Sequence, residues 1–291
     1  MAKGKNELKT PYGLFFDMRE LWYCGLVANV VDVFEQTKDE RLKVFMNKFE
    51  HHIFKVQQRL PDGTLIRVDN GRKVVQSDDA YMAVIFLVRM WKLTCESRYL
   101  DEAISQLILY HTYLFDAKYK LYHHVWYVDE KRSGGAYWGR GNGWMMLAFA
   151  ELLDYLPEKH PQRKQVLSLF TEQIQNLIPF QQDNGLWCQV LNLKTSYPES
   201  SCSAMITYSI ARGINKGWLT DNYCTNARKG WNGLLQKLTP NNDIESVCVG
   251  THFSDNVNYY LTRPKQISDR HVLGSFLMAG AEITKLNEKI K

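Results

Sequence analysis

Residues 76–115 read QSDDAYMAVIFLVRMWKLTCESRYLDEAISQLILYHTYLF and contain two helical patterns of different character. The first, residues 80–93, is apolar on nearly every face, which predicts a helix that is buried on all sides. The second, residues 99–115, carries a one-sided apolar stripe with polar and charged residues opposite, which predicts a helix that faces solvent. This stretch therefore predicts an inner helix backed by an outer one.

The same order recurs along the chain: an extended segment, a polar turn, an apolar helix and a charged helix. The extended segments are residues 62–68, 120–128, 185–191 and 245–252. The polar turns are residues 76–79, 139–142, 197–201 and 268–271. The apolar helices are residues 80–93, 143–156, 202–214 and 273–286. With an N-terminal pair at 20–36 and 39–57, the pattern predicts nine helices. Inner helices ringed by outer ones make an all-α (α/α)6 barrel, which has about twelve helices. We expect such a barrel, shortened at its N-terminus, with short β fingers at its mouth, in a single domain over residues 1–291.

Composition and charge exclude several classes of protein. The net charge is +5, and the basic residues are mixed with acidic ones, so we expect no nucleic-acid partner. A small anionic substrate is compatible with this charge. The six cysteines lack the spacing of a zinc site, and we expect neither a metal nor a cofactor. No apolar run reaches membrane-spanning length, and the start lacks the apolar core of a signal peptide. The chain thus reads as cytoplasmic, or as periplasmic if an export signal was removed.

The turns before the inner helices converge at the mouth, so residues far apart in sequence are expected to meet there. The turns and fingers contribute Asp78, Asp79, Arg140, Asn142, Glu199, Ser200, Ser201, Asp269, His271, His123, His124, Trp126, Trp187 and Gln189. Because side chains alternate along an extended segment, only one of His123 and His124 is expected to face the cavity.

The adjacent carboxylates Asp78 and Asp79 open an apolar helix. One acid at this place is enough to cap the helix and to meet its dipole, and Ser77 could also cap it. A second carboxylate beside Tyr81 and Met82 is a candidate proton donor, because apolar surroundings raise the pKa of a carboxyl group.

The segment SGGAYWGRGNGW, residues 133–144, contains three alternating glycines. A dinucleotide-binding loop would need a preceding strand and a parallel βαβ unit, and a P-loop would need Gly-Lys-Ser/Thr; neither is present. We interpret the glycines as permitting tight turns that direct Trp138, Arg140 and Trp144 towards the mouth. Two rings and a guanidinium suit a sugar acid. The alternative, a structural turn with core tryptophans, remains open.

Several of these blocks together resemble glycoside hydrolase family 105, the unsaturated rhamnogalacturonyl and related unsaturated glucuronyl hydrolases. The blocks are SDDAYMA, LYHHVW, YWGRGNGWMMLAFAELLDYLP, GLWCQVLN…YPESSCSAM and DRHVLGSFLMAGAE, in family order from about residue 60 to the end. The resemblance implies a hydrolase, a glycosidase of pectin or glycosaminoglycan-like polysaccharide degradation. Its substrate would be a small acidic oligosaccharide that ends in a Δ4,5-unsaturated uronic acid.

The resemblance also implies residue roles. Asp78 would protonate C4 of the vinyl ether and activate the water that adds at C5. The implied substrate-binding residues are Met82, His124, Trp138, Arg140, Trp144 and Trp187, with His124 rather than His123 as the hydrogen-bonding histidine. The chain departs from the family at Cys188, where a histidine is usual, and at Gln76, where a tryptophan is frequent. For the family's second active-site acid, the candidates are Asp17 and Asp32.

Two other functions remain open on the sequence alone. A degenerate barrel would bind acidic oligosaccharide without turnover, which the short N-terminus and Cys188 favour. An α/α-barrel polysaccharide lyase would create the unsaturated bond instead of consuming it. The sequence leaves the choice between galacturonyl and glucuronyl substrates open.

Overall fold

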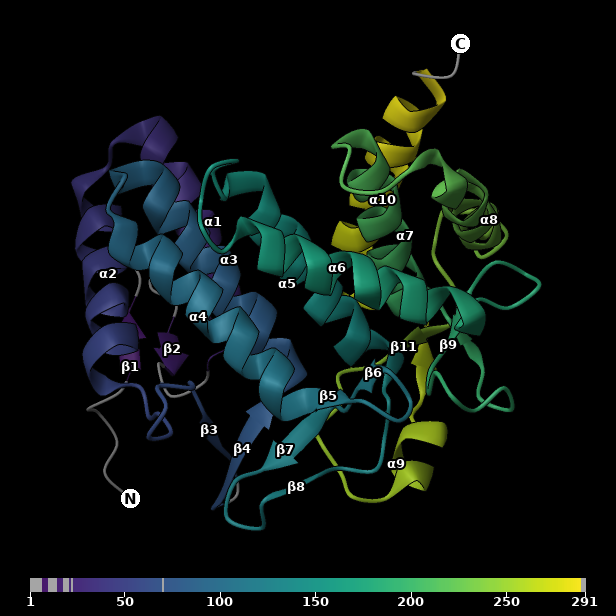
Figure 1. Cartoon of the computed structure of the whole chain (residues 1–291), viewed down its shortest axis with the longest axis horizontal. Coiled ribbons are helices and arrows are strands. Elements are labelled where there is room, and N and C mark those ends of the chain that lie inside the picture. The colour runs from purple at the N-terminus through teal and green to yellow at the C-terminus, as the bar shows by residue number, and fades with distance from the viewer. Residues whose placement is uncertain (1–6, 10–14, 18–20, 22, 70, 289–291) are drawn as a thin grey trace.

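The computed structural model of the protein describes residues 7–9, 15–17, 21, 23–69 and 71–288, with side chains from Leu21 onward within these ranges. Helices dominate it (Figure 1). The long helices are α1 (Tyr23–Thr37), α2 (Glu40–His51), α3 (Ser77–Thr94), α4 (Ser97–Leu114), α5 (Gly139–Tyr155), α6 (Arg163–Leu177), α7 (Ser200–Asn215), α8 (Cys224–Leu235) and α10 (Leu273–Glu288). The described residues add the short α9 (Val257–Leu261), a π-helical turn at His52–Val56 and 3-10 turns at Ile178–Phe180 and Asp221–Tyr223.

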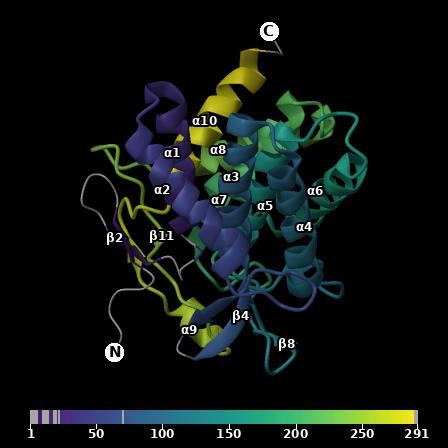
Figure 2. The same ribbon diagram turned by 90° about the vertical axis from the view of Figure 1, so that its left-hand side faces the viewer.

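The helices are arranged as an inner row backed by an outer row. The inner helices α1, α3, α5, α7 and α10 contact one another in that order, and α2, α4, α6 and α8 pack on α1, α3, α5 and α7. Two views at right angles show the outer helices α2, α4 and α6 flanking the inner row (Figures 1 and 2). This arrangement is the α/α barrel expected from the sequence, and the nine long helices of the described residues are the nine that the pattern predicts.

The contrast between inner and outer helices has the predicted physical basis. In α3, buried residues include every position from Ala83 to Val88, so no face of this helix meets solvent over that stretch. In α4 the buried residues recur three or four apart, as at Leu100, Ala103, Ile104 and Leu107, which leaves one face for water. Burial of the apolar inner helices against one another and against the outer row therefore provides the core of the molecule.

Short antiparallel strands gather at one end of the helices, the mouth, where the inner helices begin (Figure 1). A four-stranded sheet has the order β3 (Arg67–Asp69), β4 (Arg72–Gln76), β7 (Val125–Tyr127) and β8 (Arg132–Ser133). The two-stranded pairs are β1 (Glu7–Lys9) with β2 (Phe15–Asp17), β5 (Phe115–Asp116) with β6 (Leu121–Tyr122), β9 (Trp187–Cys188) with β10 (Pro198–Glu199), and β11 (Val247–Cys248) with β12 (Lys265–Gln266). The expected β fingers are thus present.

The glycines of the GRGNG segment serve close packing rather than tight turns. Gly139, Gly141 and Gly143 lie within α5, and none has a positive φ. A Cβ added at Gly139 would lie 2.6 Å from the Cys188 carbonyl oxygen, and one at Gly141 would lie 2.5 Å from Oγ of Ser77. The expectation of tight turns is therefore wrong. The absence of side chains instead lets the start of α5 approach β9 and the start of α3.

Candidate active site

The two adjacent carboxylates at the start of α3 have different partners. Gln76 occupies the N-cap position, so neither acid caps the helix. Asp79 is fully buried, and Arg67 of β3 donates to both of its oxygens, over 3.1 Å from Nε to Oδ2. Asp78 has a side chain that is 17% exposed, and it contacts His124. The buried ion pair makes Asp79 a structural group, which leaves Asp78 as the carboxylate of the mouth.

His124 holds one oxygen of Asp78. Its Nε2 lies 3.1 Å from Oδ2, and the Ser77 hydroxyl donates to the same oxygen over 3.2 Å. The described residues provide no hydrogen bond to Oδ1. The backbone fixes this geometry, because the amide of Ser77 donates to the His124 carbonyl over 3.0 Å. Oδ1 is therefore the oxygen of Asp78 that remains for chemistry.

The neighbouring histidine points elsewhere, as the alternation along the finger predicts. Nε2 of His123 lies 3.2 Å from the carboxylate of Asp116. His124 is fully buried, with its ring centroid 4.4 Å from that of Trp138 and 5.5 Å from that of Tyr260. His124 thus stands behind Asp78 within an aromatic cluster, and Trp138 shares that cluster.

The electrostatic surroundings lower the pKa of Asp78. Burial pushes it upward, but the hydrogen bond with His124 and the charges of Arg67 and Arg140 outweigh this effect. The expectation that apolar neighbours raise this pKa is therefore wrong for the ligand-free protein. Asp78 is a carboxylate at neutral pH.

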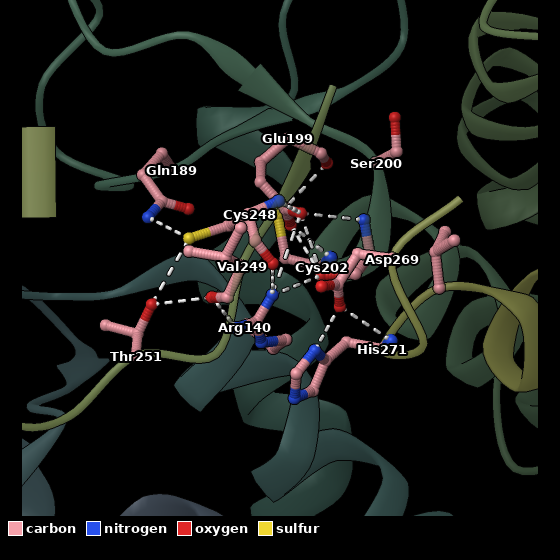
Figure 3. A network of polar contacts seen from close by, with 12 residues as sticks. Arg140, Gln189, Glu199, Ser200, Cys202, Cys248, Val249, Thr251, Asp269 and His271 are labelled. Carbon is pink, nitrogen blue, oxygen red and sulfur yellow. Dashed lines mark hydrogen bonds and ion pairs between the residues drawn. The ribbon is translucent and has the colours of Figure 1, made fainter. Parts of the chain in front are cut away.

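Arg140 is 1% exposed and joins the start of α5 to the β11 region (Figure 3). It donates to the carbonyls of Cys248 and Val249 over 2.6 and 2.8 Å, and to the Ser201 hydroxyl over 3.2 Å. Its guanidinium carbon lies 4.6 Å from the Trp138 ring. Within the described part of the chain, Nε of Arg140 and Nε1 of Trp138 are buried donors without a hydrogen-bond partner.

Glu199 completes this network; the sequence placed it at the mouth but gave it no role. It is fully buried, lies 4.0 Å from Arg140, and accepts hydrogen bonds from the backbone amides of Ser201, Cys202 and Cys248. It therefore caps α7 and ties β11 to it (Figure 3). An acid just before a Ser-rich helix start was the available signal.

Met82 lies on α3, four residues after Asp78. Trp144 lies on α5 and contacts the same stretch of α3. Trp144 is half-buried and stacks on Tyr81, one turn beyond Asp78, with ring centroids 5.0 Å apart. Met82 is also half-buried, and its sulfur approaches Gly25 of α1 so closely that a Cβ there would lie 2.6 Å away. Both side chains pack, partly buried, against the main hydrophobic core.

Trp187 does not join this group. It is fully buried in the main hydrophobic core, and its indole Nε1 donates to the Leu177 carbonyl over 2.8 Å. Its placement among substrate-binding residues therefore requires correction: the alternating pattern of the finger put its ring on the inner face, where it packs between helices. The structural alternative that the sequence left open concerned Trp138 and Trp144, and of these Trp138 is 1% exposed and packs in a small cluster with Val190 and Tyr260.

Of the two candidates for a second acid, Asp32 is not brought to Asp78. Asp32 of α1 pairs with Nε of Arg89 over 3.1 Å, and Arg89 lies eleven residues beyond Asp78 on α3, about 16 Å along the helix axis. Asp17 belongs to β2, and its side chain lies outside the described residues.

Other expected features of the chain concern metals, membranes and thiols. Among the described residues, no cluster of three or more His, Cys, Asp or Glu side chains could hold a metal ion. No helix in the described ranges has the length and apolarity needed to cross a membrane. All six cysteines are free; five are buried, whereas Cys95 at the end of α3 is exposed.

Comparison with known proteins gives consistent results. The model of Glycosyl Hydrolase Family 88 matches residues 6–287. An unsaturated 3S-rhamnoglycuronyl hydrolase of Alteromonas sp. (strain LOR) is 30% identical over 177 residues, 59% of this chain and 43% of that protein. The unsaturated rhamnogalacturonyl hydrolase YesR of Bacillus subtilis (strain 168) is 26% identical over 251 residues, 84% of this chain and 67% of that protein. The chain thus spans about half to two thirds of the length of these relatives.

A solved structure of a family 105 glycoside hydrolase from C. acetobutylicum ATCC 824 has the same fold. It superposes with a TM-score of 0.84 at 21% identity and covers 93% of this chain and 82% of that one. The resemblance to family 105 that the sequence blocks indicate is confirmed by these findings. Since the family model spans nearly the whole sequence, the chain belongs to Glycosyl Hydrolase Family 88.

Proposed function

We propose that the protein hydrolyses lyase-generated oligosaccharides by removing a Δ4,5-unsaturated uronic acid from the non-reducing end. The observation that carries this proposal is Asp78, a carboxylate at the mouth with one oxygen held by His124 and the other free. Arg140 lies near enough for its charge to act on Asp78. An acid–base carboxylate beside a cation is the minimum that hydration of an anionic vinyl ether requires.

The unpartnered donors support an anionic ligand. Buried polar groups are normally hydrogen-bonded, and Nε of Arg140 and Nε1 of Trp138 are among the buried atoms of the described residues that have no partner. A uronate carboxylate would satisfy such donors, and a charge-assisted bond to a guanidinium is about twice as strong as a neutral one. The rings of Trp144 and Tyr81 add flat apolar surface of the kind that packs against a pyranose.

The proposed reaction adds water across the C4–C5 double bond. Protonated Asp78 transfers its proton to C4, and the positive charge that develops at C5 is shared with the ring oxygen. Water adds at C5 and gives its proton to Asp78, which restores the acid. The resulting hemiketal opens by breaking the bond between C5 and the ring oxygen, which leaves a ketone at C5. The hemiacetal then formed at C1 collapses to an aldehyde and releases the partner sugar.

The negative charge of the bound substrate lets Asp78 take up from solvent the proton that the reaction needs. The pKa of Asp78 is lowered in the ligand-free protein, so the acid must gain a proton before it can donate one. A bound carboxylate close to Asp78 disfavours a second negative charge and raises this pKa. In this scheme Arg140 binds the substrate anion, and its positive charge thereby ceases to stabilise ionised Asp78.

The test is an ultraviolet assay over a panel of lyase products that differ in the uronic acid and in the sugar attached to it. A hydrolase removes the absorbance of the double bond conjugated to the carboxylate. A polysaccharide lyase would instead produce this absorbance from saturated polymer. Loss of absorbance with release of the partner sugar supports the proposal, and its absence across the panel contradicts it.

A second candidate function is binding of acidic oligosaccharide without turnover. The observation in its favour is that Arg140 is buried and already donates to two carbonyls, while Asp78 is ionised. Saturable binding of panel members, measured by calorimetry, with no change in absorbance would select this function.

A further inference from the structure

The ring of His124 has polar neighbours on both nitrogens. Nε2 faces Oδ2 of Asp78 and the carboxamide of Gln76, each at 3.1 Å. Nδ1 lies 2.8 Å from the hydroxyl of Tyr260, which belongs to α9 and is fully buried. The proton on this ring can therefore be assigned from the hydrogen bonds that surround it.

The Tyr260 hydroxyl decides the assignment. Its oxygen accepts a hydrogen bond from the backbone amide of Ser254 over 3.0 Å. Burial raises the pKa of Tyr260, so the phenol keeps its proton. Within the described residues, Nδ1 of His124 is the acceptor that lies within reach of that proton. A buried hydroxyl donates when an acceptor is available, because an unsatisfied donor costs about 1–3 kcal/mol.

We propose that Tyr260 is a positioning residue, which fixes His124 in the neutral tautomer protonated on Nε2. In this tautomer His124 donates to Oδ2 of Asp78, and Oδ1 remains free to exchange the proton with substrate. The proposal rests on the proposed function for its catalytic meaning. The tautomer itself is a property of the free protein.

Other protonation states leave unfavourable contacts. With the proton on Nδ1, the Tyr260 oxygen would receive two donors and its own hydrogen would have no acceptor, while a lone pair on Nε2 would face ionised Asp78. With both nitrogens protonated, the phenol hydrogen would again have no acceptor. With Nε2 protonated, Gln76 satisfies the contact by turning its amide oxygen to the ring.

The segment that carries Tyr260 is anchored to the finger sheet. Asp255 pairs with Arg132 over 2.7 Å and with Arg72 over 3.3 Å. These contacts hold the segment after β11 against β4 and β8. Both strands flank β7, which begins directly after His124. The titratable or charged groups beside the Asp78–His124 pair include Tyr260, Asp79, Arg67 and Arg140.

The test combines spectroscopy with kinetics on the full chain. Two-bond 1H–15N correlation spectra of protein labelled with 15N-histidine distinguish the two tautomers, and the His124 signals are those absent from H124Q. We expect the Nε2-protonated pattern in the wild type and a mixture of patterns in Y260F. In Y260F, kcat is expected to fall about tenfold with KM unchanged, because one hydrogen bond in the relay is lost.

Tyr259→Phe is the matched control. Its hydroxyl accepts from the His252 amide over 3.2 Å and does not contact His124, so the tautomer and kcat should remain those of the wild type. An Nδ1-protonated wild type, or a Y260F spectrum identical to the wild type, overturns the proposal. If no oligosaccharide is turned over, the proposed function fails in the absorbance assay, and the spectra still decide the tautomer.

Discussion

Oδ2 of Asp78 lies 3.1 Å from Nε2 of His124, which follows it 46 residues later in the chain. This contact connects the start of α3 to the finger that precedes β7. It explains why the pKa of Asp78 is lowered in spite of burial, and it predicts how the stability of the protein depends on pH.

A carboxyl group with a lowered native pKa stabilises the folded state above its unfolded pKa, about 3.9 for Asp, and this contribution is lost as the pH falls through the native value. For Asp78 the groups responsible are His124, Arg67 and Arg140. The advantage of wild type over Asp78→Asn in free energy of unfolding should therefore be greatest near neutral pH and shrink below about pH 4. Urea unfolding of both proteins over a pH series measures it. A constant or growing difference towards acid pH would contradict the assignment.

The buried guanidinium of Arg140 should be important for stability. Arg140→Met leaves Glu199 buried without its cation and removes the donors to the Cys248 and Val249 carbonyls. Breaking a buried pair in this way costs about 3–5 kcal/mol of unfolding free energy. The control is Arg41→Met. The side chain of Arg41 is 66% exposed and pairs with Asp39, so this variant should lose about 0–1 kcal/mol of unfolding free energy. Equal losses in the two variants would show that Arg140 is not part of a buried network.

Close packing at the start of α5 predicts an unusual glycine effect. Alanine normally stabilises a helix relative to glycine by about 0.5–1 kcal/mol. Gly141→Ala should instead destabilise by about 1–3 kcal/mol, because its Cβ would meet Oγ of Ser77 at 2.5 Å. Gly274→Ala in α10 should instead stabilise the protein, because no atom lies within 4 Å of the Cβ that alanine would add. Thermal unfolding of both variants checks the pair, and stabilisation by Gly141→Ala would refute the close approach.

Two of the three tryptophans assigned to the site from the sequence, Trp144 and Trp187, should differ in their effects. Trp187→Phe loses the bond to the Leu177 carbonyl and should lower stability by about 1–3 kcal/mol with little change in KM. Trp144→Phe shortens a half-buried ring on Tyr81 and should raise KM with a smaller loss of stability. Denaturation and steady-state kinetics on both variants give the comparison. A raised KM in Trp187→Phe would return Trp187 to the site.

The sequence predicted the helices well because an apolar helix and an amphipathic one differ locally. The contrast between residues 80–93 and 99–115 requires no knowledge of distant contacts. Local sequence does not show which of Asp78 and Asp79 is the carboxylate of the mouth. That depends on Arg67 and His124, which reach the two carboxylates only in the tertiary structure.

The same limit applies to the other site residues. Arg140 was placed at the mouth by its position in a turn, and Trp187 by its position in an extended finger. The alternation of side chains along a finger does not tell which face of the finger meets solvent and which packs against helices. The role of Gly139 and Gly141 likewise depends on the distance between helices, which the chain sets only when α3, α5 and β9 assemble.

The most direct test of the account is the time course of ultraviolet absorbance when an unsaturated uronyl disaccharide is incubated with wild type and with Asp78→Asn. The wild type should remove the absorbance, whereas Asp78→Asn should bind the disaccharide and leave the absorbance unchanged, with its fold confirmed by circular dichroism. Asp116→Asn, which changes a carboxylate of the neighbouring finger, should retain activity. An Asp78→Asn variant as active as the wild type would contradict the central claim.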